Sequence, residues 1–280
     1  MKFIRTVSGR SWLGRSSNGV SSSQAVVLNR LRDLLEAGQY EEVEAGALAA
    51  AARRDCGRSL MGVWLARAMA LAAGIAHGRG ADVLAELDAL IAELEQTEGA
   101  NRRLLLAVRA NRVVALVGQG RCAEAEAEAQ DILRAVTRLA HLTEMWWVEL
   151  SALDSLAEAL CGQSRYEEAE AIARGNLPRA EGHREAGFQC VLVRSLNGQG
   201  RFEEALAEAR RITQHLTRAG SGVQGIVTAT ALHGLSRRTE AEATARDALS
   251  ACEQFLHPDH PRIREARTLL ARITAEDPLP

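Results

Sequence analysis

Two histidines and an aspartate lie close together near the C-terminus, in the stretch H-P-D-H-P from His257 to Pro261. His257, Asp259 and His260 are residue types that bind zinc, which usually takes three protein ligands in a catalytic site and four in a structural one. Nothing upstream in the sequence completes such a set, and the other histidines are scattered. We therefore expect no metal, no cofactor and no catalytic residues, so the chain is not predicted to be an enzyme.

Paired glutamates could act as an acid and a base, and glycine-containing turns could cradle a phosphate. The pairs Glu41–Glu42, Glu167–Glu168 and Glu203–Glu204 each follow a short turn, where the positive end of a helix dipole favours carboxylates. The glycine turns lack the G-x-x-x-x-G-K-[ST] pattern, and no strand precedes them. Both features are therefore interpreted as structural.

The turns recur along the chain, each as a small residue followed by a short polar stretch. These six anchors are Gly38, Gly78, Gly120, Ser164, Gly200 and Ser236, at intervals of about 40 residues. Apolar residues precede most anchors by seven and four positions and follow them with spacings of four and three, which places them on one face of a helix. A glycine can end the first helix in the left-handed conformation, and a serine can cap the second. Each repeat is therefore predicted to be a helix–turn–helix hairpin.

The composition agrees with helices throughout, because the chain is rich in alanine, leucine, arginine and glutamate and only 4% aromatic. We predict an all-α fold, a right-handed α-solenoid of about six helix-turn-helix repeats plus a C-terminal capping helix. The solenoid spans residues 23–276 and follows a flexible basic tail at 1–22. The hairpins are expected over roughly 24–53, 58–96, 100–139, 143–175, 181–219 and 221–256. The capping helix, about 260–275, has Pro261 in its first turn and Asp259 as its expected cap.

The G-R-[YF]-E-E-A core from Gly200 to Ala205, its near copy from Ser164 to Ala169, and the alanine stripe behind them resemble the tetratricopeptide repeat family. The longer repeats and the segment from Ala248 to Ala271 resemble the kinesin-light-chain type, with repeats of roughly 42 residues. The resemblance covers about residues 24–275. It implies that the H-P-D-H-P stretch is a turn between repeats.

The resemblance also implies a concave groove, lined by the first helix of each repeat, that holds a peptide. Asparagine suits such a groove because its amide both donates and accepts hydrogen bonds, and arginine offers a forked donor to a carboxylate. By their offsets from the anchors, the groove candidates are Asn29, Arg32, Asn111, Asp154, Glu158, Arg194, Asn197, Thr230 and His233.

The leading functional hypothesis is a non-catalytic adaptor that binds a protein or peptide segment in this groove. The alternative is a peptide-sensing regulatory module that acts through a separate output protein, because only 22 residues precede the repeats. A third hypothesis is self-association, because an exposed apolar stripe at the end of the array can pair with that of a second copy.

Charge, cysteines and hydropathy limit the partners and the compartment. The net charge of −2 leads us to expect neither nucleic acid nor an anionic membrane as a partner. We also expect no membrane span, since no 18 consecutive residues are apolar. Five widely spaced cysteines without a C-x-x-C motif and the lack of a secretory signal favour the cytoplasm. Lys2 is the only lysine, and this arginine bias is typical of GC-rich coding, so we expect a bacterial source.

Overall fold

The computed structural model describes residues 22–52, 60–97, 101–139, 145–212 and 218–275. Within these ranges the chain forms thirteen α-helices and two short 3-10 turns. Their bounds are α2 (Ser22–Glu36), α3 (Tyr40–Ala52), α4 (Leu60–His77), α5 (Gly80–Glu95), α6 (Arg102–Gly118), α7 (Cys122–Leu139), α8 (Trp146–Gly162), α9 (Tyr166–Asn176), η1 (Leu177–Arg179), α10 (His183–Gly198), α11 (Phe202–Ala209), η2 (Arg218–Gly220), α12 (Val223–Gly234), α13 (Arg238–Phe255) and α14 (Pro261–Ala275).

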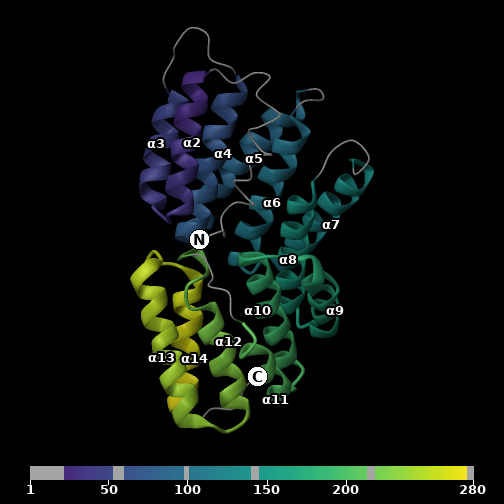
Figure 1. Cartoon of the computed structure of the whole chain (residues 1–280), viewed down its shortest axis with the longest axis vertical. Coiled ribbons are helices and arrows are strands. Elements are labelled where there is room, and N and C mark those ends of the chain that lie inside the picture. Colours follow the sequence, from purple (N-terminus) through teal and green to yellow (C-terminus); the bar gives the residue numbers. More distant parts are fainter. Residues whose placement is uncertain (1–21, 53–59, 98–100, 140–144, 213–217, 276–280) are drawn as a thin grey trace.

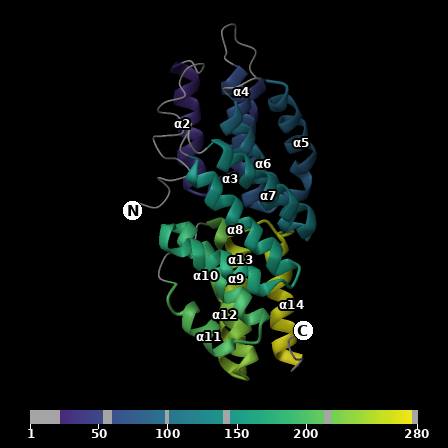
Figure 2. The ribbon, with the colours of Figure 1, turned by 90° about the vertical axis from the view of Figure 1, so that its right-hand side faces the viewer.

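The helices form six consecutive hairpins, from α2–α3 to α12–α13, and α14 follows the last hairpin as a single helix. Each helix packs against the next one along the chain. Figures 1 and 2 show the purple and blue hairpins α2–α5 at one end of the molecule and the green and yellow helices α10–α14 at the other. The predicted all-α solenoid of six repeats with a C-terminal capping helix is confirmed. The predicted tail lies outside the described residues apart from Ser22.

The first helices of the hairpins form a layer of their own. Helices α2, α4, α6, α8, α10, α12 and α14 each pack against the next member of this series, whereas the second helices of neighbouring hairpins make fewer contacts with one another. Closer packing on one side bends a stack of hairpins towards that side. We call these seven helices the inner layer.

Each hairpin turns at its anchor through a residue with positive φ. The angle is +72° at Gly38, +99° at Gly78 and +73° at Gly200, and the two serine anchors adopt it as well, with +60° at Ser164 and +59° at Ser236. The expected capping role of these serines is therefore wrong, because the turn needs its left-handed residue there and the cap position falls on the arginine that follows.

An aromatic ring and a glycine interlock between neighbouring hairpins. Tyr166 and Phe202 lie two residues after their anchors, and each ring covers a glycine two residues before the next anchor, Gly198 and Gly234. A Cβ atom on Gly234 would come within 2.5 Å of the Phe202 ring. Only glycine therefore lets the two hairpins approach this closely.

The arginine after an anchor ties its hairpin to the preceding one. Arg165 Nη1 lies 2.7 Å from Glu126 Oε1, and Arg201 Nη1 lies 2.7 Å from Glu170 Oε2. Each arginine also pairs with a glutamate three residues further along its own helix. Both side chains are 39% exposed, so solvent screens each pair and its contribution to stability is small.

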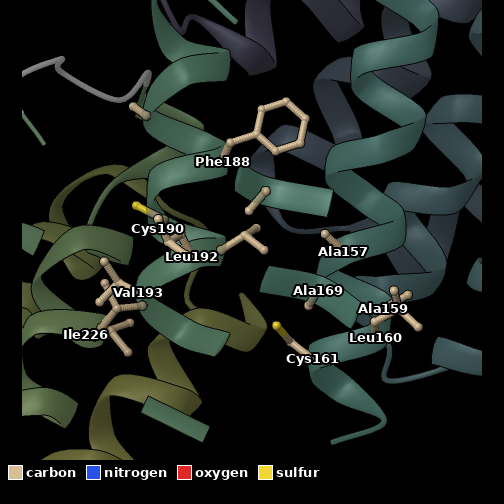
Figure 3. Close-up of a cluster of buried hydrophobic side chains, with 14 of the residues drawn as sticks. Ala157, Ala159, Leu160, Cys161, Ala169, Phe188, Cys190, Leu192, Val193 and Ile226 are labelled. Atoms are coloured by element: carbon tan, nitrogen blue, oxygen red, sulfur yellow. The ribbon is translucent and has the colours of Figure 1, made fainter. Parts of the chain in front are cut away.

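Small residues let the hairpins close onto a shared apolar core. The predicted alanine stripe is buried, and Ala169, Ala205 and Ala241 have no exposed area. Figure 3 shows Ala157 and Ala169 near Leu160, with Phe188 and Leu192 on the neighbouring helix. Phe188 is the largest fully buried side chain. The core thus combines close backbone approach at alanine with a few large side chains that fill the remaining space.

The composition of α4 differs from what we expected, because we predicted that no segment of the chain could span a membrane. By length and composition it could cross one, with a mean hydropathy of 1.4 over 18 residues. However, 56% of this window is buried, because α4 packs against α2, α3, α5 and α6. Its one charged residue other than histidine, Arg67, pairs with Glu86 and Glu93 on α5. These contacts are those of a core helix.

Two helix ends differ from the predicted ones. Helix α11 ends at Ala209 rather than near residue 219, because the chain tightens there into turns bonded three residues back. At the start of α14 the cap is His260 rather than Asp259. The Nδ1 atom of His260 accepts the backbone N–H of Arg262 at 3.0 Å, as a capping side chain does.

Candidate functional site

All nine predicted groove residues lie on helices of the inner layer. Two are on α2, one on α6, and two each on α8, α10 and α12: Asn29, Arg32, Asn111, Asp154, Glu158, Arg194, Asn197, Thr230 and His233. Asn197 is buried, and the other eight are partly exposed. Because successive first helices pack side by side, these residues follow one another along a single layer.

Arg194 joins three helices of this layer. Its Nη1 atom donates a 2.6 Å hydrogen bond to Glu265 Oε1 on α14, and its Nε atom lies 3.5 Å from Glu158 Oε2 on α8. Glu265 and Glu158 raise the pKa of Arg194, although burial opposes them. Burial alone would raise the pKa of Glu265, but Arg194 outweighs it and holds that pKa below its usual range. We call Glu158, Arg194 and Glu265 the inner bridge.

Asp154 and Arg184 lie beside the inner bridge without a close ion pair between them. Burial and the charge of Glu158 raise the pKa of Asp154 to about 7, while Arg184 acts in the opposite direction. Burial lowers the pKa of Arg184, which is only 9% exposed. Within the described part of the chain, Asp154 Oδ1 and Arg184 Nε have no hydrogen-bond partner. Both atoms are also shielded from solvent, so these two polar groups are buried without a partner.

A glycine makes room for Asp154 between α8 and α10. A Cβ atom at Gly187 would lie 3.2 Å from Asp154 Oδ1 and 3.3 Å from Oδ2, which is tighter than most such contacts. The same face of α10 carries Arg184, one turn before Gly187, and Arg194, two turns after it. Helix α10 thus presents two guanidinium groups with the Asp154 carboxyl between them.

Some predicted residues make internal contacts instead. Asn197 Nδ2 donates to the carbonyl oxygen of Val227 at 2.8 Å, which ties α10 to α12. The Thr230 hydroxyl donates to the carbonyl of Ile226 in its own helix. Arg32 pairs with its neighbour Asp33. Asn29 and Asn111 lie on α2 and α6, away from the inner bridge on α8, α10 and α14.

Sequence reasoning missed Arg184, Arg262 and Glu265. Arg262 donates to the carbonyl of Ser221 at 3.3 Å, and its pKa is lowered by burial. The capping helix was expected only to cover the last apolar stripe, yet it contributes two of the charges around Arg194. No spacing in the sequence relates Arg194 to Glu265, since the two meet only through the curvature of the array.

The cysteines beside this charged cluster are unreactive thiols. Cys161 and Cys190 are buried, and burial is the main cause that raises the pKa of each to about 12. Cys122 and Cys252 are also free, so the four cysteines that the structure describes form no disulfide. Thiols with such pKa values remain protonated at neutral pH and are poor nucleophiles.

The comparisons with known proteins bear on the fourth hairpin and on the fold. Residues 150–181, from α8 through η1, match the family model described as tetratricopeptide repeat. No curated protein matches the chain. Among solved structures, the chain is similar to the crystal structure of Bacillus thuringiensis PlcR in complex with the peptide PapR7 and DNA, at 13% identity and a TM-score of 0.46, with 90% of this chain and 74% of that chain covered. A likeness at this level carries no functional information.

One expectation about partners is corrected. The net charge of −2 led us to expect no nucleic-acid partner, whereas the PlcR structure, to which the chain is similar, holds DNA as well as peptide. The physical reason is that a net charge sums over the whole chain, whereas nucleic acid is bound by a local basic surface. Nucleic acid is therefore not excluded as a partner.

The hairpins around the matched repeat resemble it. The matched hairpin of α8 and α9 is one of six that share the same turn. Between the later hairpins, aromatic rings over glycines and arginine bridges recur. The chain therefore contains a tetratricopeptide-type hairpin at residues 150–181, within an array of six similar hairpins.

Proposed function

We propose that the chain is a non-catalytic adaptor that binds a segment of a protein or peptide along its inner layer. The observation that supports this most is the row of partly exposed polar side chains on successive first helices. A stack of hairpins holds such groups in fixed positions before the partner arrives, which limits the entropy lost on binding. Binding of this kind needs no catalytic residue.

The inner layer changes from apolar to charged along its length, and this change limits which partner segments can bind to it. Six residues before the anchor stand Val114 in the third hairpin, Glu158 in the fourth and Arg194 in the fifth. Val114 is apolar and 41% exposed. We therefore propose a partner segment with an apolar stretch, which contacts α6, and a charged stretch, which contacts α8 and α10.

The described cysteines support a cytoplasmic location. All four are free thiols, which is typical of proteins in a reducing compartment. A regulatory module that senses a peptide and acts through a separate output protein would use the same inner layer. The two functions differ in whether the array changes shape when the segment binds.

The experiment is an affinity capture from the native host with two matched variants. Val114→Arg places a charge on the exposed apolar part of the inner layer. Leu48→Arg makes the same change at a 60% exposed position on α3, a second helix. We expect the partner to be lost by Val114→Arg and retained by Leu48→Arg. Equal retention by both variants would contradict binding along the inner layer.

A further inference from the structure

Two turns far apart in the sequence meet where the ends of the array come together. The backbone N–H of His257, in the turn between α13 and α14, donates to the carbonyl of His77 at the end of α4, at 3.2 Å. The two imidazole rings lie edge to face, with centroids 5.2 Å apart. Gly78 lies against the ring of His260. We call this the end-to-end contact. In Figure 1, α13 and α14 lie below α2–α4.

A second close contact joins the same two ends of the array. The turn at Gly38, between α2 and α3, lies so close to Arg218 that a Cβ atom there would overlap the arginine side chain. The guanidinium of Arg218 in turn lies 5.6 Å from the ring centroid of Phe255 on α13. The turns at Gly38 and Gly78 therefore rest on the segments that precede and follow the last hairpin, α12–α13.

The apolar cores on the two sides of the end-to-end contact are separate. One buried cluster extends from Leu106 to Ile273, and another extends from Leu28 to Ala115. Among the described residues, the second cluster contains none from α12, α13 or α14. Opening the contact therefore exposes little apolar area, in contrast to opening the stack between two neighbouring hairpins.

We propose that the end-to-end contact is a latch that holds the array closed, and that its release opens the inner layer. The latch is small, polar and separate from the apolar cores, so it can break while every hairpin stays folded. Helix α14 begins at the latch with its cap His260 and carries Glu265 of the inner bridge little more than a turn later. Release therefore also loosens the inner bridge. The consequence for partner access rests on the proposed function, but the latch itself does not.

Charged and titratable groups surround the latch on every side. Glu41 Oε1 on α3 lies 3.9 Å from His77 Nε2, and Asp259 Oδ2 lies 3.7 Å from His257 Nδ1. His260 is influenced by three charged residues of α14, Arg262, Arg264 and Glu265, and by His77 at the end of α4. The Nδ1 atom of His260 is already used, because it accepts the N–H of Arg262.

Acid is expected to release the latch. Burial lowers the pKa of His77, with Glu41 opposing it and His257 acting in the same direction. Burial and Arg262 lower the pKa of His260 to about 4. A histidine whose pKa is lowered in the closed form takes up a proton more readily in the open form. The closed form is therefore most stable above pH 6.5, about the ordinary pKa of histidine, and its stability decreases as the pH falls from there towards 4.

The test compares two glycine variants of the full chain. Gly78→Ala places a Cβ atom 2.5 Å from Cδ2 and 2.9 Å from Cβ of His260, so the latch cannot close as it stands. Gly120→Ala also places an alanine at a positive φ at another anchor, +72° compared with +99° at Gly78, but it meets nothing within 4 Å. Two quantities are measured at pH 7.5 and pH 5: hydrogen exchange of the His257 amide relative to interior amides of α13, and the radius of gyration from small-angle scattering.

We expect Gly78→Ala to speed exchange at His257 by roughly tenfold or more and to increase the radius of gyration, with α13 still protected. Gly120→Ala should behave like the unmodified chain, and the unmodified chain at pH 5 should approach Gly78→Ala. Unchanged exchange and radius in Gly78→Ala would overturn the latch. Equal changes in both variants would also overturn it, since strain alone would then explain them. Neither outcome depends on a partner, so the latch can fail while the proposed function stands.

Discussion

Arg194 shows how a single residue can serve both the fold and the proposed function. Its guanidinium is shared between Glu158 and Glu265, at distances of 3.5 and 2.6 Å. It was predicted from its position on a first helix, and the structure places it on the inner layer. Its partner Glu265 was not predicted. A carboxylate that enters along the inner layer must compete with Glu265 for this arginine.

The inner bridge should stabilise the chain more than a surface pair of the same type. Arg194→Met leaves two glutamates facing each other without their cation, so we expect a loss of about 1–3 kcal/mol in the free energy of unfolding. The control is Arg267→Met, which removes a pair with Glu253 whose side chains are 59% and 45% exposed, and it should cost less than about 1 kcal/mol. Urea unfolding of both variants gives the comparison, and equal losses would contradict a special role of the bridge.

Asp154 should make stability depend on pH. Its pKa is about 7 in the folded chain, above the ordinary value, so the folded chain holds a proton that the unfolded chain releases between about pH 4 and 7. The stability that this proton provides is complete at low pH and is lost as the pH rises through that window. Asp154→Asn stays neutral, so it should be more stable than the unmodified chain at pH 8, by about 1–3 kcal/mol, and similar to it near pH 4.

Unfolding experiments with Asp154→Asn at pH 4, 6 and 8 measure this difference. The residue keeps some exposed area, which is why we expect less than the full effect of its pKa shift. A gain that is the same at all three pH values would show that the substitution acts through packing rather than through the proton.

At the scale of the helices, the hairpins are joined by a small set of contacts that recur at fixed offsets. An aromatic ring covers a glycine of the next hairpin, and an arginine reaches back to the preceding one. The sequence shows the aromatic residue and the anchor, because both recur at fixed spacing. It does not show why glycine stands two residues before the anchor, since that depends on the ring that packs over it.

Two glycines at the same repeat position should respond in opposite ways to alanine. Gly198 lies directly under the Tyr166 ring, so Gly198→Ala should destabilise the chain by about 1–3 kcal/mol. Gly118 stands at the equivalent position of the third hairpin with nothing within 4 Å, so Gly118→Ala should stabilise α6 by up to about 1 kcal/mol. Thermal unfolding of both variants tests this, and destabilisation by both would contradict the role given to the ring.

At the scale of the whole molecule, the sequence predicted the repeats and their helices but not the way in which the array closes. Repeats are local features, so anchors such as Gly120 and Gly200 locate them directly. The meeting of His77 with His257, and of Arg194 with Glu265, depends on small rotations summed over several hairpins. No single residue determines the total rotation of the array, so contacts between residues that this rotation brings together could not be predicted from the sequence.

The proposed function requires that a partner segment lies along the inner layer. A photoreactive benzoylphenylalanine at position 114, on α6, tests this in cells of the native host, with the same residue at position 48, on α3, as the control. Both sites are exposed, at 41% and 60%. We predict that a partner crosslinks at position 114 and not at position 48. Crosslinking to the same partner at position 48 alone would contradict the claim and place binding on the second helices.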